Sequence, residues 1–442
     1  MTSAPLLIYV QKLTPRVEYI FSTLLEAIGI HSIKFTPDRE HFTFNTGAKI
    51  NYSSVRITAE ECWTKPIALL FQKDIVAQPI DSFEWNGTRA FFKVDEGDFP
   101  FDVFAAAFYL MSRYEEYLPH TEDMYGRYAH ENSLAYRERF LHLPVVNKWL
   151  TELEHLLRSK FPDLPPNPTA FHFLPTYDID IAWSYLCKGA FRNAGGFLKS
   201  MIHGEWTAVK ERAGVLFKKK ADPFDSYKWL HRLHKEHRLK PLYFFLLASS
   251  NRKYDRNILP ARSAMQRLIK EHDHRYLAGI HPSWHSGDKP RHLKKEIEVL
   301  KILTGKKVNK SRQHYIRMNL PITYRRLIDA GITEDYSMGY GSINGFRASY
   351  CLPYQWYDLQ KEEMTPLTIY PFCYMDANSF YEQHLSADEA LQEMLHYCEV
   401  VKDVKGLFIS IWHNHFLGTD KMFEGWKEAY AAAVEKISGS SA

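Results

Sequence analysis

Residues 173–183 read FLPTYDIDIAW and place two carboxylates, Asp178 and Asp180, where an apolar run ends. An apolar run of this length, rich in aromatic and β-branched residues, predicts a buried strand. In sheets of parallel strands, chemistry occurs at the edge where the strands end. The two acids therefore predict a functional edge of a parallel sheet.

Strand-like and helix-like segments alternate after residue 169. This alternation predicts a parallel sheet that is closed or nearly closed into a (β/α) barrel. Gly305 is placed to end one of the helices. The expected strands are residues 169–178, 240–249, 275–281, 311–318, 367–376 and 406–415, and the expected helices are residues 226–237, 261–272 and 292–305.

A proline-rich segment divides the chain. Residues 161–169 read FPDLPPNPT, and proline neither donates to a sheet nor continues a helix, so this segment predicts a linker. Residues 1–160 are expected to form a smaller mixed α/β domain of unknown role, and residues 170–442 the barrel. The apolar run at 99–111 is too short to span a bilayer and has helical spacing.

Composition restricts the class of protein. The 442 residues carry a net charge of +4, which is too small to indicate binding to nucleic acid. Five cysteines without CxxC spacing predict reduced thiols with structural roles. The first residues lack the basic start and long apolar core of a signal peptide. Together these features predict a cytoplasmic protein.

Polar residues of catalytic type end several other apolar runs, namely His281, Asp376 and His413. Strands of one barrel would bring these side chains to the same rim. His285 follows His281 by four residues, and two histidines at this spacing share one helix face and can bind zinc. Because the chain has 21 histidines, such a pair also arises by chance.

A site of this composition predicts metal-assisted hydrolysis. One carboxylate and two histidines leave coordination positions for water and substrate. A second nearby carboxylate would take a proton from that water, and His413 would protonate the leaving group. The alternative for His413 is a core histidine bonded to a backbone carbonyl, because Trp412 and Phe416 make its surroundings apolar.

These motifs resemble the polysaccharide deacetylases of carbohydrate esterase family 4, the NodB-homology fold. The resemblance covers about residues 168–435. The phrases SRYEEY, HPSWHS, SRQHY, DYSMGY and GFRAS are similar to a subgroup common in Bacteroidetes that carries its own N-terminal domain. The resemblance implies an irregular (β/α) barrel and a divalent metal, usually zinc. It also implies removal of N- or O-acetyl groups from sugars.

By position, the resemblance makes Asp178 the base and makes Asp180, His281 and His285 the metal ligands. His413 matches the general acid. TYDID stands where the family usually has TFDDG, and the residue after the first histidine lacks the usual hydroxyl group.

For each of the two supporting roles, the sequence offers two candidate residues. Either Arg312 or Arg347 would steady the base; chain order favours Arg312 and leaves Arg347 for substrate. Either Asp335 or Asp376 would orient the acid. Ordinary roles are the alternative, namely a salt bridge for each arginine and a helix cap or turn for each aspartate.

Residues 186–220 intersperse basic side chains among apolar ones. This pattern predicts contact with an anionic membrane surface, which would make the protein peripheral to a membrane. The alternative is a pair of solvated helices beside the mouth of the barrel.

The leading hypothesis is a metal-dependent deacetylase that acts on an N-acetylated sugar of a glycan or glycan precursor. One alternative is an amidohydrolase that acts on a small non-sugar amide, because a fold does not determine its substrate. The other is a non-catalytic carbohydrate-binding protein with a degenerate site. A binding protein, however, has no need for a base, an acid and a metal together.

Overall fold

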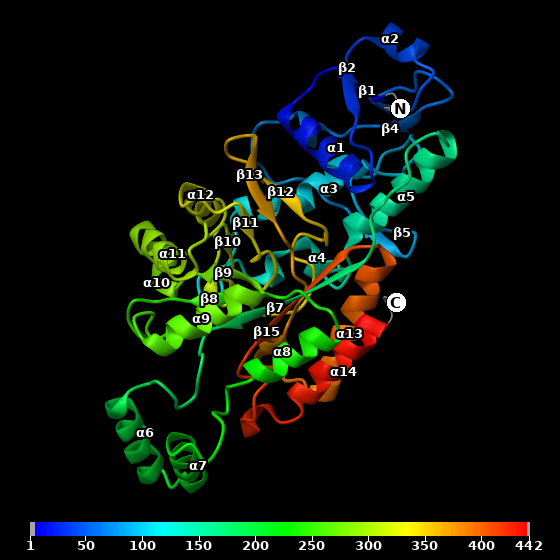
Figure 1. Cartoon of the computed structure of the whole chain (residues 1–442). Helices are drawn as coiled ribbons and strands as arrows, with labels where there is room; N and C mark the ends of the chain where they lie inside the picture. Colours follow the sequence, from blue (N-terminus) through cyan, green and yellow to red (C-terminus); the bar gives the residue numbers. More distant parts are fainter. Residues whose placement is uncertain (1–4, 440–442) are drawn as a thin grey trace.

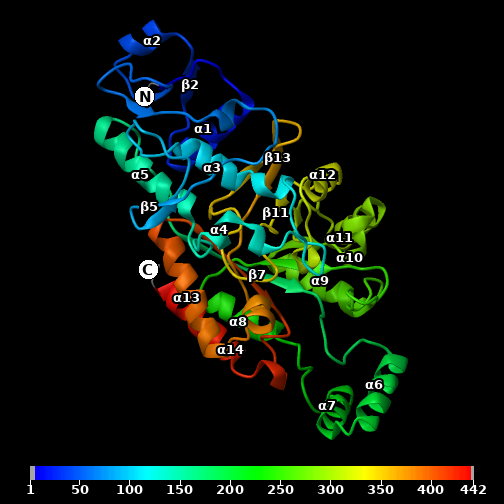
Figure 2. The same ribbon diagram turned by 180° about the vertical axis from the view of Figure 1, so that it is seen from behind.

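A computed structural model describes residues 5–439, without the side chains of residues 191 and 192. Figures 1 and 2 show an elongated molecule in which a small N-terminal part sits above a larger part built around one sheet. No helix in the described range is both long enough and apolar enough to cross a bilayer.

The large sheet has the strand order β12-β13-β11-β10-β9-β8-β7-β15-β14. All neighbouring pairs are parallel except β12 with β13. Within residues 5–439 no strand pairing joins β12 to β14, so the sheet is continuous over nine strands and its closure into the expected barrel is not seen in the strand pairing. The bounds are β7 (His172–Ile179), β8 (Leu242–Leu246), β9 (Leu277–His281), β10 (Lys310–Ser311), β11 (Glu334–Asp335), β12 (Tyr354–Asp358), β13 (Glu363–Ile369), β14 (Tyr374–Met375) and β15 (Leu407–His413).

β7 lies in the interior of this sheet although it contains Pro175, which cannot donate to a ladder. It pairs with β15 from His172 to Asp178 but with β8 only from Thr176 to Ile179. The proline therefore precedes the part of β7 that is bonded on both sides, where a missing N–H would weaken the sheet. The part of β7 that leads to Asp178 is therefore paired with a strand on each side.

Amphipathic helices connect the strands and cover the sheet (Figure 1). Two of them have clear end signals: α13 begins with a capping box between Ser386 and Glu389, and α11 ends at Gly305, whose φ of 70° is the left-handed conformation that glycine favours. The helices are α8 (Tyr227–Glu236), α9 (Ser263–Arg275), α10 (Trp284–Asp288), α11 (Pro290–Thr304), α12 (Ile322–Asp329), α13 (Ala387–Asp403) and α14 (Trp426–Gly439), and the short helical turns are η4 (His314–Ile316), η5 (Asn378–Glu382) and η6 (Lys421–Phe423).

The N-terminal part has its own four-stranded parallel sheet of order β2-β1-β3-β4. All nine residues of α3 are buried, so the apolar run at 99–111 forms a core helix. The strands are β1 (Leu6–Tyr9), β2 (Ile33–Thr36), β3 (Lys49–Tyr52), β4 (Cys62–Thr64), β5 (Phe83–Trp85) and β6 (Thr88–Ala90), and the helices are α1 (Pro15–Ala27), α2 (Arg39–Phe44), η1 (Ala68–Phe71), α3 (Val103–Met111), η2 (Tyr114–Tyr117), η3 (His130–Asn132), α4 (Leu134–Arg137) and α5 (Val145–Lys160).

A buried ion-pair network ties the two parts together. Glu116 in η2 binds Arg347 through two hydrogen bonds of 2.8 and 2.6 Å, and it also accepts a 2.7 Å hydrogen bond from Arg113. Burial opposes ionisation of Glu116, but Arg347 and Arg113 outweigh burial and lower its pKa to about 2. The charged SRYEEY phrase at the end of α3 therefore has a structural role at this junction.

We expect Glu116→Gln to lower the free energy of unfolding by about 3–5 kcal/mol, because it leaves the buried Arg347 without a counter-charge, whereas Arg113 keeps its ion pair with Glu115. In the wild type, ionised Glu116 adds to the free energy of unfolding at pH values above the ordinary glutamate pKa. This added stability is lost as the pH falls toward the lowered pKa of Glu116, about 2. Urea unfolding at neutral pH measures the change. Glu298→Gln, which breaks an exposed pair with Lys301, is the matched control and should change stability by less than about 0.5 kcal/mol.

Candidate active site

A cavity of about 710 Å³ opens where β7, β9 and β15 end. Four residues predicted from the sequence line it, namely Asp178, Asp180, His281 and His413. Its wall also includes groups from the N-terminal part and from the segments after β8, β10 and β14.

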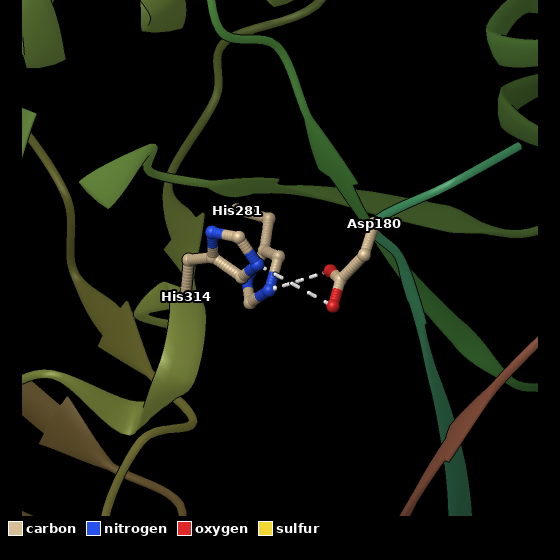
Figure 3. A group of neighbouring side chains, drawn as sticks. All are labelled: Asp180, His281 and His314. Atoms are coloured by element: carbon tan, nitrogen blue, oxygen red, sulfur yellow. Dashed lines mark ion pairs between the residues drawn. The ribbon is translucent and has the colours of Figure 1, made fainter. Parts of the chain in front are cut away.

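Asp180, His281 and His314 form the one candidate metal-binding group among the described residues (Figure 3). Nε2 of His281 lies 3.1 Å from Oδ1 of Asp180, and Nε2 of His314 lies 3.4 Å from Oδ2. Burial opposes ionisation of Asp180, but His314 and His281 outweigh it and lower the pKa of Asp180 well below its ordinary value. Asp180 is therefore a carboxylate that faces two imidazoles.

Each of these imidazoles is oriented by a bond to its other nitrogen. Nδ1 of His281 donates to the backbone carbonyl of Arg312 over 2.5 Å, and Nδ1 of His314 bonds to the carboxylate of Asp255 over 3.1 Å. Such bonds fix the tautomer and leave Nε2 free to bind a metal. Asp255 is anchored in turn by the backbone N–H of Trp284.

The donor set fits zinc or a similar divalent ion. One carboxylate and two imidazoles are typical of catalytic sites that keep positions open for water and substrate. Oδ1 of Asp180 is buried and, apart from its 3.1 Å ion-pair contact with His281, has no hydrogen-bond partner within the described structure, which leaves a strong acceptor available in the middle of the group. His314, His281 and Asp180 would hold the ion.

His314 takes the place in this group that the sequence analysis assigned to His285. The prediction assumed a helix across residues 281–285, but His281 ends β9 and α10 begins only at Trp284. The imidazole of His285 instead packs against His292, with ring centroids 5.4 Å apart. The structure therefore does not bring His285 to Asp180 and His281.

His314 was missed because residues 311–318 were expected to be a strand. The strand β10 ends at Ser311, and the chain then turns through η4, where Tyr315 and Ile316 have φ values of 60° and 54°. Left-handed backbone at bulky residues is uncommon and leaves no pattern in the sequence. The only sequence signal was a histidine inside an expected strand, in the phrase SRQHY.

The carboxylate of Asp178, near the end of β7, is held by the buried side chain of Arg312. Nη1 of Arg312 donates to Oδ1 of Asp178 over 2.9 Å and to the hydroxyl of Thr176 over 2.7 Å. Oδ2 of Asp178 lies 3.8 Å from Nε2 of His281, beside the candidate metal group. Of the two candidate arginines, the structure places Arg312 against Asp178.

His413 is oriented by Asp376, which ends the expected strand at 367–376. Oδ1 of Asp376 accepts from Nδ1 of His413 and Oδ2 accepts from its backbone N–H, both over 2.7 Å. Burial lowers the pKa of His413, but the carboxylate of Asp376 outweighs burial and raises it to about 10. Nε2 of His413 points to the cavity, 3.5 Å from Oδ2 of Asp180.

Two predicted residues lie away from the cavity. Arg347, expected to contact substrate, is bound to Glu116 at the junction with the N-terminal part. Asp335, the alternative partner of His413, accepts from Ser311 and Ser337, and within residues 5–439 it forms no hydrogen bond or ion pair with His413. The structure therefore pairs His413 with Asp376 and gives Asp335 a role in fixing the loop after β11.

The N-terminal part contributes Tyr125 and Arg127 to the cavity wall. Arg127 donates from Nη1 to the backbone carbonyl of Tyr315 over 2.7 Å, next to His314. The ring of Tyr125 packs against Tyr315, with centroids 5.3 Å apart, and Trp284 stacks on Tyr254 at 4.1 Å. One side of the cavity is thus an aromatic wall assembled from distant parts of the chain.

Comparison with known proteins gives a family match for the N-terminal part alone. A family of unknown function (DUF7033) matches residues 6–162. No curated protein matches the chain.

Several solved structures are weakly similar to part of the chain. A Mycobacterium smegmatis protein assigned as a polysaccharide deacetylase is 13% identical, with a TM-score of 0.40, and the match covers 62% of this chain and 86% of that one. The polysaccharide deacetylase of Bacillus cereus is 10% identical, with a TM-score of 0.29 and coverage of 61% and 88%. An allantoinase is 12% identical, with a TM-score of 0.39 and coverage of 63% and 89%. Because these likenesses are weak, the function proposed below rests on the geometry of the site.

We expect His314→Ala to lower zinc affinity by more than the roughly 100-fold typical of losing an outer-sphere partner. His285→Ala is the matched control and should bind zinc as the wild type does. Elemental analysis and zinc titration of the two purified variants measure the difference. Loss of zinc from His285→Ala with retention by His314→Ala would contradict the ligand set drawn from the structure.

Proposed function

We propose that this chain is a metal-dependent hydrolase that removes an acetyl group from an N-acetylated sugar of a glycan or glycan precursor. The observation that carries the proposal is the position of the Asp180, His281 and His314 group between two oriented side chains, Asp178 and His413, in one cavity. A divalent ion such as zinc held by this group would supply a Lewis acid that polarises a carbonyl and lowers the pKa of water.

Asp178 is suited to act as the general base. Its Oδ1 is occupied by Arg312, while Oδ2 lies beside His281 and can accept a proton from a water molecule at the group. Arg312 is itself fixed by Thr176, by the carbonyl of Tyr336 and by the ring of Phe244. The base therefore has one fixed orientation.

His413 is suited to act as the general acid. Its raised pKa keeps the imidazole protonated at neutral pH, and its Nδ1 proton is already committed to Asp376. The proton on Nε2 is the one that can pass to the leaving amine as the carbon–nitrogen bond breaks. Asp178 would thus accept a proton and His413 would donate one, on either side of Asp180.

A sugar substrate is supported by the wall of the cavity. Sugar rings have apolar faces that pack on aromatic side chains, and Tyr125, Tyr254 and Tyr315 line this wall. Lys253 and Arg256 at the rim add donors for hydroxyl or acidic groups of a glycan. The aromatic residues of the segment 336–357, by contrast, belong to the buried core.

We expect wild-type protein loaded with zinc to release acetate from oligomers of N-acetylhexosamine. Asp178→Asn should lower kcat by about a hundredfold or more while binding zinc as the wild type does, since it removes the base and leaves the metal group intact. Acetate release and zinc titration measure the two effects. Hydrolysis of small cyclic or linear amides without release from acetylated sugars would favour the amidohydrolase alternative. Sugar binding without turnover by loaded wild type would favour a binding protein.

Asp376→Asn should move the alkaline limb of the kcat/KM profile to lower pH. The substitution removes the charge that raises the pKa of His413, so the acid loses its proton earlier as the pH rises. A pH profile of acetate release checks the shift. Asp335→Asn, a buried carboxylate outside the cavity, is the control and should leave the limb in place. An unchanged limb in Asp376→Asn would contradict the assignment of His413 as the acid.

A further inference from the structure

Helices α6 (Ala190–Ile202) and α7 (Trp206–Leu216) form a hairpin that projects from the body of the protein (Figures 1 and 2). It leaves the sheet after β7, shortly beyond Asp180, and returns to α8. The hairpin corresponds to the basic segment 186–220, which the site described above does not use.

The hairpin is held in a defined shape by its own contacts. Asp222 closes its base by accepting from the backbone N–H groups of residues 184–186. Arg212 in α7 donates to the backbone carbonyl of Asn193 in α6, and its guanidinium lies over the ring of Tyr185. Val215 is fully covered between these elements. The side chains that face outward are therefore not needed for packing inside the hairpin.

Large apolar side chains cover the outward side. Leu198, Met201 and Ile202 follow the spacing of one helix face and are 60%, 48% and 73% exposed, and Trp206 after the turn is 58% exposed. Phe217, at the end of α7, is 75% exposed. This concentration of apolar groups on one small projection marks an interaction surface.

The same segment holds an excess of positive charge. Residues 186–220 contain eight lysines and arginines and two glutamates, which give six net positive charges, whereas the whole chain has only four. The remainder of the chain is therefore slightly acidic. Lys199 lies between the exposed apolar residues of α6, and Lys218, Lys219 and Lys220 follow Phe217 in exposed positions.

We propose that the α6–α7 hairpin docks on the surface of an anionic phospholipid membrane. Exposed leucine, isoleucine and tryptophan side chains enter the boundary between headgroups and acyl chains, and the surrounding lysines pair with anionic headgroups. Two copies of the hairpin would instead bring like charges together, so charge complementarity favours the lipid surface. The proposal is independent of the chemistry in the cavity.

Sedimentation of the whole chain with vesicles tests this assignment. Binding to phosphatidylcholine vesicles that contain phosphatidylserine is expected, with weak binding to phosphatidylcholine alone and weakening by salt. Lys218→Gln/Lys219→Gln/Lys220→Gln should reduce binding by roughly a hundredfold, and Ile202→Ser/Trp206→Ser should also reduce it strongly. Deacetylation of a water-soluble substrate should be unaffected by either set of changes.

Matched controls come from α11 and from Lys289, the residue that precedes it. Ile302→Ser replaces an equally exposed isoleucine (71%), and Lys289→Gln/Lys294→Gln/Lys295→Gln replaces three exposed lysines, so neither should reduce sedimentation. Equal binding to neutral and anionic vesicles, or equal losses in hairpin and control variants, would overturn the proposal. Failure of the wild type to sediment would also overturn it. A dimer in analytical ultracentrifugation that Ile202→Ser/Trp206→Ser abolishes, without vesicle binding, would assign the surface to a second copy of this chain.

Discussion

The pairing of β7 with a parallel strand on each side determines the geometry of the whole site. On one side His413 of β15 is in register with Asp178, and on the other Asp178 is in register with Phe244 of β8. The next pairing, of β8 with β9, sets Leu246 against His281. Backbone hydrogen bonds thus set the spacing of Asp178, His413 and the imidazole of His281 before any side chain interacts. A slip of one residue in β7 would turn Asp178 to the other face of the sheet.

Each reactive side chain is also fixed by a buried partner. Arg312 serves twice, because its guanidinium binds Asp178 and its carbonyl accepts from His281. Asp376 holds His413, and Asp255 holds His314. Because the partners are buried, the four groups have little freedom to rotate, which is the preorganisation that catalysis requires. The cavity can therefore hold carboxylates and imidazoles close together while each side chain keeps its own orientation.

The sequence predicted those features that follow from regular structure. Strand ends identified Asp178, Asp180, His281 and His413 as neighbours, and the structure has all four in one cavity. The sequence could not predict His314, because its position depends on a short turn with left-handed residues after β10. The HxxxH spacing was misleading because β9 extends to His281 and α10 begins only at Trp284. No helix therefore spans both histidines and places them on one face. Closure of the sheet into a barrel depends on long-range contacts that no local pattern specifies.

The bond from Arg127 to the carbonyl of Tyr315 has a consequence for the modular organisation of the chain. Arg127 belongs to the segment that matches the family of unknown function, whereas Tyr315 directly follows His314. The turn that presents this imidazole is thus braced by a separate sequence module. Replacing the N-terminal part with an unrelated segment would remove this support of the turn, so the two parts are structurally coupled across the proline-rich segment at 161–169.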